Sequence, residues 1–263
     1  MAILTLDGYI GAAKQLAVQK KTTSMTSVAQ VWQSPFALAG TPGAGVLAGT
    51  DTAAGVVPTD ATAGVPVINA FGGGAKGYIT RLNGYNSVSG QIMLADLLYK
   101  AGAYAFNASQ TLTGQPSFAG RVPFGTDFTG CEIYLEAVTA FTGNQSIRIV
   151  YTDGNDVSRD TGVIATGVAP IVGRMFKMPM IGGAGVKRID QVISSVATVG
   201  TFNVLVIRPL AYMRIPFAGY SEQRDLYGTG MPEIFADSAL AVYVRADSTA
   251  SGLPEWDIEI ANA

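Results

Sequence analysis

Histidine is absent from the 263 residues of this chain. The protein therefore lacks the side chain that most often acts as a general base, as the partner of a catalytic nucleophile and as a zinc ligand. Its single cysteine, Cys131, cannot form an intrachain disulfide, so the chain needs no oxidising compartment. Cys131 lies within an apolar alternation and has no histidine to activate it, which favours core packing over a nucleophilic role.

Charge is also scarce. Charged residues make up 14% of the chain, against about 25% in a typical soluble domain. The net charge of -2 gives no electrostatic footprint for nucleic acid or an anionic membrane. Such a chain covers its surface either with partner proteins or with Ser, Thr, Asn, Gln and Gly. Its 32 glycines and 12 prolines favour turns and extended segments over helices.

Targeting and membrane signals are missing from the sequence as given. Residues 1–15 have no basic region ahead of an apolar run and no small-residue cleavage site, so we expect no signal peptide. No uninterrupted apolar run reaches the roughly 18 residues that a membrane-spanning helix needs. We therefore expect a protein that is made and assembled in a cytoplasm.

Residues 6–19 have the apolar spacing of a short amphipathic helix. The positions three and four apart are Leu6, Tyr9, Ile10, Ala13, Leu16 and Ala17. Asp7 is placed to cap its start, and Lys20 and Lys21 suit its C-terminal end. A helix of about three turns is marginal alone, so we expect it to dock on this subunit or on a neighbour.

The stretch from Phe36 to Gly77 is built almost entirely from small, apolar and turn-forming residues. It contains one basic residue, Lys76, and two acids, Asp51 and Asp60, and it has neither helical nor strand periodicity. Alone it cannot offset an ordering cost of about 1–2 kcal/mol per residue for the backbone. We predict an extended arm over residues 22–77 that makes inter-subunit contacts.

Beyond residue 77 the pattern predicts short strands. Asn83–Gly84 has the composition of a hairpin turn, and residues 91–99 fit either a strand or a short helix. The clearest hairpin joins strand 131–138 to a strand through residues 147–151, with turns at 142–144 and 153–156. Further strands are expected at 188–197, 201–209, 238–246 and 255–260.

Seven to nine short strands predict a mainly β protein, an antiparallel β-sandwich. A jelly roll is the preferred topology, and an immunoglobulin-like sandwich is second. We expect one sandwich domain over residues 78–263, preceded by the helix and the extended Gly/Ala/Thr-rich arm over residues 1–77.

Candidate sites for nucleotide and metal are weak. The glycine-rich pieces "TPGAGVLAGT", "AFGGGAKG" and "MIGGAGVKR" do not match the spacing of a phosphate-binding loop, which favours backbone freedom or close approach to another chain. Asp153, Asn155, Asp156 and Asp160 carry oxygen ligands that suit calcium, but the same residues suit a tight turn. We expect no metal and no cofactor.

Paired acids and aromatic residues suggest two further functions, glycoside hydrolysis and sugar binding. The pairs Glu132–Glu136 and Asp257–Glu259 could serve glycoside hydrolysis, although solvated strand faces explain both more simply. Trp32, Trp256 and the eleven tyrosines could form a sugar-binding platform, yet most aromatics fall at alternating positions typical of sheet packing. We expect no catalytic residues.

Three segments together resemble structural proteins of tailed bacteriophage virions. They are residues 1–15, residues 133–156 ("IYLEAVTAFTGNQSIRIVYTDGND") and residues 230–244 ("GMPEIFADSALAVYV"). The resemblance is one of texture and segment order over most of the chain. It implies a virion component with a β-sandwich body, on or within the capsid shell, and brings no catalytic residues with it.

We therefore expect a non-enzymatic capsid decoration or minor capsid protein in the virion, assembled in the host bacterial cytoplasm. Its expected partners are copies of itself, as a trimer or higher oligomer, and the major capsid protein or other virion proteins, with no nucleic acid and no membrane. A tail, neck or baseplate subunit is the alternative within the same class. A carbohydrate-binding adhesion module of a phage fibre is the alternative from another class.

Overall fold

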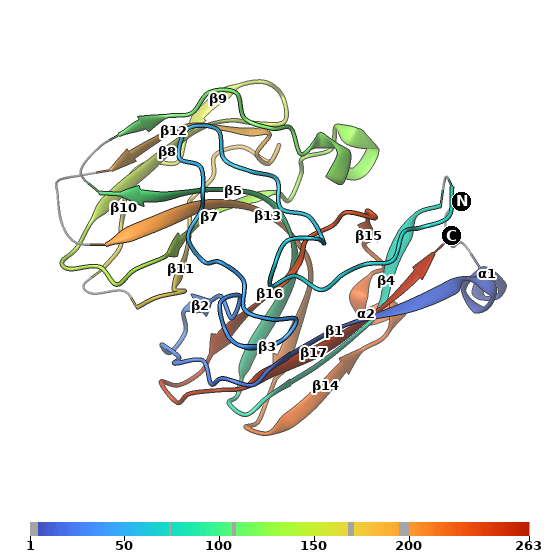
Figure 1. Ribbon diagram of the computed structural model, residues 1–263. Coiled ribbons are helices and arrows are strands. Elements are labelled where there is room, and N and C mark those ends of the chain that lie inside the picture. The colour runs from blue at the N-terminus through green and yellow to red at the C-terminus, as the bar shows by residue number, and fades with distance from the viewer. Residues whose placement is uncertain (1–4, 74, 107–108, 168–170, 195–199, 263) are drawn as a thin grey trace. The chain divides into compact units, whose positions relative to one another are not determined.

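The computed structural model describes residues 5–73, 75–106, 109–167, 171–194 and 200–262. The fold is mainly β, with 45% of residues in strands and 6% in helices (Figure 1). The strand pairings within both sandwiches are antiparallel wherever their register is described. The predicted antiparallel β-sandwich with a short N-terminal helix is confirmed, while the jelly-roll topology stays a prediction.

The chain forms two compact units. Unit 1 comprises residues 1–45, 59–96 and 210–263, and unit 2 comprises residues 46–58 and 97–209. Strands β5 (Gly90–Ala105) and β13 (Thr201–Ile215) contribute residues to both. The expected boundary after residue 77 stays a prediction.

Unit 1 is a sandwich of two sheets. Besides its parts of β5 and β13, it contains α1 (Leu6–Gly11), β1 (Ala13–Lys21), β2 (Trp32–Gln33), β3 (Gly40–Thr41), β4 (Gly77–Asn86), β14 (Tyr220–Arg224), α2 (Leu226–Thr229), β15 (Glu233–Ile234), β16 (Leu240–Ala246) and β17 (Pro254–Asn262). One sheet has the order β14-β4-β17-β1-β3, and the other has the order β13-β5-β16-β2. Alternate apolar side chains of both sheets meet in the core, among them Leu82, Trp256 and Ile258 from the first and Ile92, Met213 and Val242 from the second.

The N-terminal helix is shorter than predicted. Thr5 caps α1 by accepting a hydrogen bond from the backbone N–H of Gly8 at its Oγ1. The helix ends at Gly11, and the prediction of a helix through residue 19 is wrong, because β1 pairs with β17 along its length. The exposed and buried faces of β1 are inverted: Leu16 faces outward, whereas Gln19 and Lys21 are buried, so the apolar spacing was misleading.

Unit 2 is a second sandwich. Besides its parts of β5 and β13, it contains β6 (Gln110–Thr111), the short 3-10 helices η1 (Ala119–Arg121) and η2 (Pro123–Gly125), β7 (Glu132–Ala137), β8 (Ser146–Thr152), β9 (Ser158–Asp160), β10 (Ile164–Ala165), β11 (Met175–Lys177) and β12 (Arg188–Ser194). One sheet has the order β10-β8-β12-β6, with β9 also paired to β8, and the other has the order β11-β7-β13-β5. Its core joins aliphatic residues of both sheets to a cluster of aromatic rings, including Phe106, Phe141 and Phe202.

The turn expected at Asn83–Gly84 is wrong. Asn83 and Gly84 lie inside β4 rather than in a turn, and an added Cβ on Gly84 would lie 2.1 Å from Met213 Cε. The glycine therefore leaves room for the ends of the Met213 and Ile92 side chains in the core. Residues 91–99 form part of strand β5 and not a helix.

The expected hairpin between residues 131–138 and 147–151 is also wrong. Both segments are strands, but β7 pairs with β13 and β11, whereas β8 pairs with β12, β9 and β10. Residues 138–145 thus connect two sheets. The turn at 153–156 does form a hairpin, between β8 and β9.

Candidate functional site

Residues 46–58, which we call the strap, contain no regular strand and cross unit 2 as an extended segment (Figure 1). The buried side chain of Asn203 holds its first part. Asn203 Oδ1 accepts a hydrogen bond from the backbone N–H of Gly49 over 2.8 Å, and its Nδ2 donates to the carbonyl of Leu47 over 2.7 Å. The same Nδ2 donates to Glu136 Oε2 over 2.8 Å. One amide from β13 therefore binds both the strap and the carboxylate of β7.

Strand β5 holds the rest of the strap. Lys100 Nζ donates to the carbonyl of Val46 over 3.0 Å, Tyr99 donates its hydroxyl to the carbonyl of Ala54, and Tyr104 donates to that of Thr52. In addition, the backbones of Val56 and Lys100 exchange two hydrogen bonds of 2.9 Å. The strap is thus held mainly through hydrogen bonds to its backbone. Its attachment to unit 2 therefore does not require large side chains in the strap.

Glycine allows the strap to approach β5 closely. A Cβ on Gly49 would lie within 2.8–2.9 Å of the backbone of Gly102, and a Cβ on Gly55, whose φ is +68°, would lie 2.2 Å from the Tyr99 hydroxyl. At the far end Arg121, which is 2% exposed, donates to the carbonyls of Pro58 and Leu97. Gly49 and Gly55 thus approach strand β5 of their own chain, while the expected close approach of glycines to another chain stays a prediction.

The electrostatics of the strap site follow from burial. Burial raises the pKa of the Tyr99 and Tyr104 hydroxyls above their ordinary value, and it lowers the pKa of Lys100. Backbone N–H groups of Ala54 and Ala53 lower the pKa of Asp51 by donating to its carboxylate. At neutral pH the tyrosines are therefore neutral donors and Asp51 is an ionised acceptor.

Buried or partly buried polar groups also hold the parts of the Phe36–Gly77 stretch that belong to unit 1. Lys21 Nζ donates to the carbonyls of Leu38 and Pro42, and burial lowers its pKa. The Gln15 side chain exchanges two hydrogen bonds with the backbone of Asn69. The expected arm is thus bound to its own chain at both ends as well as at the strap.

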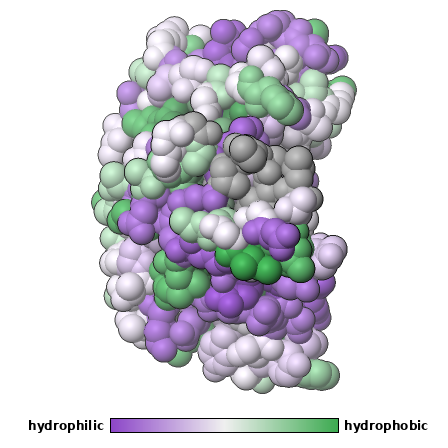
Figure 2. Space-filling view, turned by 90° about the vertical axis from the view of Figure 1, so that its right-hand side faces the viewer, coloured by the Kyte–Doolittle hydropathy of each residue, from purple (hydrophilic) through white to green (hydrophobic). Residues whose placement is uncertain are grey.

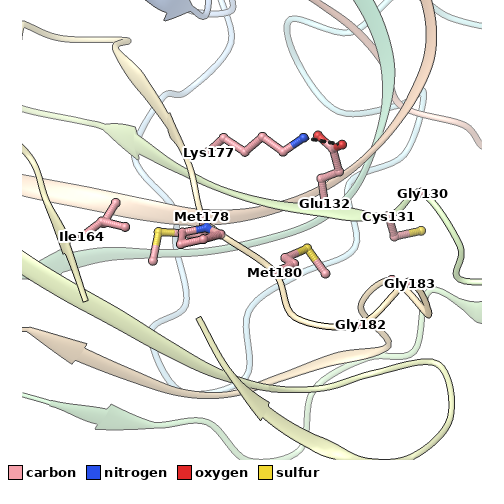
Figure 3. Close-up of a pocket in the computed structure, with 11 residues that line it drawn as sticks. Gly130, Cys131, Glu132, Ile164, Lys177, Met178, Met180, Gly182 and Gly183 are labelled. Atoms are coloured by element: carbon pink, nitrogen blue, oxygen red, sulfur yellow. Dashed lines mark hydrogen bonds and ion pairs between the residues drawn. The ribbon is translucent and has the colours of Figure 1, made fainter. Parts of the chain in front are cut away.

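The two carboxylate pairs make hydrogen bonds and ion pairs within the chain. Glu136 is buried against Asn203, while Glu132 is partly exposed and forms an ion pair with Lys177 over 2.6 Å. The expected solvated face is therefore wrong for Glu136. Figure 3 shows the Glu132–Lys177 pair at an open cavity of about 680 Å³, which Cys131, Met178 and Met180 help to line. Cys131 is buried in the core, as predicted.

Asp257 and Glu259 lie on the outer face of β17, as predicted. Asp257 accepts from Asn83 Nδ2 over 2.8 Å, and Glu259 accepts from the hydroxyls of Tyr9 and Thr80. These hydrogen bonds dock α1 on the sheet and lower the pKa of Glu259 against the opposing effect of burial. The pair stabilises the sheet and the helix.

The acidic residues that were weighed as calcium ligands form contacts within the chain at this hairpin. Asp153 accepts from the backbone N–H groups of Asn155 and Val157 and pairs with Arg159 over 2.9 Å. Asp156 pairs with Lys187 over 2.6 Å. No cluster of three potential metal ligands occurs in the described part of the chain.

Exposed large apolar residues occur along the whole chain, and four of them lie in α1 and β1: Leu6, Ile10, Leu16 and Val18. Leu6 and Ile10 of α1 are 68% and 65% exposed, and Leu16 of β1 is 55% exposed. No residue of α1 is buried. Figure 2, which shows the side that carries α1 in Figure 1, has green hydrophobic patches set among purple hydrophilic ones.

The residues that hold the strap were not predicted from the sequence. Asn203 and Lys100 each interrupt an otherwise apolar strand, in "TFNVLVI" and "LLYKAGA". A polar residue within a buried strand signals a specific hydrogen-bond partner, because burying it without one is costly. That signal identifies the anchors but not what they bind.

No protein-family model and no curated protein matches the chain. Among solved structures, the VP2 subviral particle of infectious bursal disease virus is 8% identical, with a TM-score of 0.19, over 96% of this chain and 80% of that chain. A structure of the Gt strain of the same virus is 7% identical, with a TM-score of 0.19, over 95% of this chain and 81% of that chain. Likeness at this level carries no conclusion about the present chain.

Proposed function

We propose that this protein is a non-enzymatic structural subunit of a virus particle, a capsid decoration or minor subunit that associates with its own copies and with the major capsid protein. The observation that carries the proposal is the exposed apolar set of Leu6, Ile10 and Leu16. Side chains of this size at one end of a chain with few charges suit a protein–protein contact.

The fixed strap supports a rigid building block. Its backbone is held in place before any partner is bound, so association would not require ordering this segment. We therefore expect the inter-subunit contact at the exposed side chains of the Phe36–Gly77 stretch rather than at its backbone. Val46 and Val67 are 66% and 71% exposed.

The occupied carboxylates support a role without catalysis. A general acid or base needs access to a substrate. Glu136 is buried against an amide, and Asp153 binds two backbone N–H groups and an arginine. Both are used to stabilise the fold.

The resemblance to tailed-bacteriophage virion proteins supports a place in the virion after assembly in the bacterial cytoplasm. A tail, neck or baseplate subunit is the rival within this class. The number of copies per particle separates them: hundreds are expected for a capsid subunit, and a small multiple of three or six for a tail part. Quantitative mass spectrometry of purified virions measures this number.

Light scattering after size-exclusion chromatography tests self-association of the full chain. We expect a trimer or larger oligomer, and a shift to monomer in a Leu6→Ser/Ile10→Ser variant. Val163→Ser, which changes an apolar residue of 67% exposure in unit 2, is the control and should keep the oligomer. A wild-type monomer at all concentrations, together with absence from virions, would overturn the proposal.

A further inference from the structure

Trp32 and Tyr212 form an aromatic pair at the surface of unit 1. Their ring centroids lie 6.3 Å apart, with the rings inclined by 55°. Tyr212 is 51% exposed and Trp32 is half-buried. Trp256, in contrast, is 1% exposed in the core, so it cannot belong to the sugar-binding platform that was considered as an alternative. Trp32, the other tryptophan of the chain, lies beside the exposed Tyr212.

Polar side chains that donate and accept several hydrogen bonds surround this pair. Arg245 lies directly opposite Trp32 on β2 and opposite Gln91 on β5. Its guanidinium donates to the side-chain oxygen of Gln91 over 3.3 Å and to the carbonyl of Gln30 over 3.2 Å. Trp32, Arg245 and Gln91 thus form one row across three strands.

A second arginine, Arg214, forms an ion pair with Asp247, which Gln30 links to the same cluster. Arg214, two residues after Tyr212 on β13, binds the carboxylate of Asp247 with two hydrogen bonds of 3.0 and 2.7 Å. Gln30 Nε2 donates to Asp247 Oδ1 over 3.1 Å. These contacts hold the polar groups in fixed positions, which favours recognition over non-specific adhesion.

We propose that this surface binds an acidic glycan. Aromatic rings offer apolar faces to the C–H groups of a sugar ring, and fixed guanidinium, carboxylate and amide groups pair with its hydroxyls. The two guanidinium groups of Arg214 and Arg245 against the one carboxylate of Asp247 leave one net positive charge. That excess favours a carboxylate-bearing sugar over a neutral one.

Single-stranded nucleic acid also stacks on aromatic rings, but it needs a basic groove along its phosphates. Here Asp247 lies within the cluster, and the whole chain has a net charge of -2. The glycan is therefore the favoured ligand. This site does not depend on the proposed structural role.

Isothermal titration of the full chain with oligogalacturonate tests the site, with the neutral galactose oligomer and oligothymidylate as comparison probes. We expect binding of oligogalacturonate and weaker binding of the neutral oligomer. Trp32→Ala, Tyr212→Ala and Arg245→Gln should each weaken it by about tenfold or more. Circular dichroism and thermal melting establish that each variant is folded.

Tyr220→Ala is the matched control. Tyr220 is 46% exposed and pairs with Phe217 at 6.2 Å, but it lies outside the Arg214–Asp247 and Arg245–Gln91 contacts. The Tyr220→Ala variant should bind oligogalacturonate as tightly as the wild type does. The proposal is overturned by no binding of oligogalacturonate, by equal or tighter binding of oligothymidylate or the neutral oligomer, or by folded Tyr212→Ala and Arg245→Gln variants that bind normally.

Discussion

Asn203 and Gly49, which are 154 positions apart, are joined by a hydrogen bond of 2.8 Å from a backbone N–H to a buried side-chain oxygen. The amide of Asn203 also donates to Leu47 and Glu136, so its loss removes three hydrogen bonds, two of which hold the strap. We expect Asn203→Ala to lower the free energy of unfolding by about 2–3 kcal/mol. Chemical denaturation measures this loss, and the exposed Asn155→Ala should stay within about 0.5 kcal/mol of the wild type. Equal effects of the two variants would contradict the anchoring role of Asn203.

Because the strap packs closely on β5, we expect alanine substitutions at Gly49 and at Gly43 to change the stability by very different amounts. Gly49→Ala would force a methyl group against the backbone of Gly102 and should cost about 1–3 kcal/mol of stability. Gly43→Ala meets no atom within 4 Å and should be neutral or stabilise by up to about 1 kcal/mol. Thermal melting and limited proteolysis compare the two. If both variants melt alike, the strap does not approach β5 as described.

The buried tyrosines predict a loss of stability in alkali. The pKa of Tyr99 and Tyr104 is raised in the folded state, so their contribution is complete below the ordinary tyrosine pKa of about 10 and is lost as the pH rises beyond it. Lys100 acts in the opposite direction, because its pKa is lowered and the unfolded chain holds its proton more tightly.

Ultraviolet absorbance of tyrosinate isolates the tyrosine contribution. Tyr99→Phe should remove one late-titrating group, whereas Tyr227→Phe, at an 87% exposed position, should leave that late-titrating group in place. A Tyr99 signal that titrates together with the exposed tyrosines would show that its hydroxyl is not buried.

The hairpin at residues 153–156 predicts indifference to calcium. The Asp153 carboxylate already binds Asn155, Val157 and Arg159, whose hydrogen bonds lower its pKa. Neither calcium nor a chelator should change the melting temperature, whereas Asp153→Ala should lower it. Because the folded pKa is depressed, the contribution of Asp153 is present above the unfolded value of about 3.9 and is lost as the pH falls through the folded one. A rise in the melting temperature with calcium would restore the metal-binding interpretation.

Much of the strand content could be predicted from the sequence, because β7, β8 and β13 contain the alternating or β-branched apolar residues that a pleated, buried surface selects. Their pairing could not. The turn between β7 and β8 resembles a hairpin connection locally, and only the long-range pairing of β7 with β13 and of β8 with β12 separates the two strands into different sheets.

The site was harder to predict than the strands. Leu16 faces outward on β1 while Lys21 is buried, so the hydrophobic pattern suggested the wrong element. The strap has no periodicity of its own, since its position is set by Asn203, Lys100 and Tyr99 rather than by its own side chains. Such a segment is specified by its binding surface, which is encoded far away in the chain.

The distance in sequence between the strap and its anchors has a consequence for synthesis. Gly49 is added to the nascent chain 154 residues before Asn203, a delay of roughly 8–30 s at synthesis rates of about 5–20 residues per second. During that interval the nascent chain carries a long segment whose binding surface has not yet been translated. Unit 2 can therefore be completed only after β13 has been made, although the strap is the first part of that unit to be synthesised.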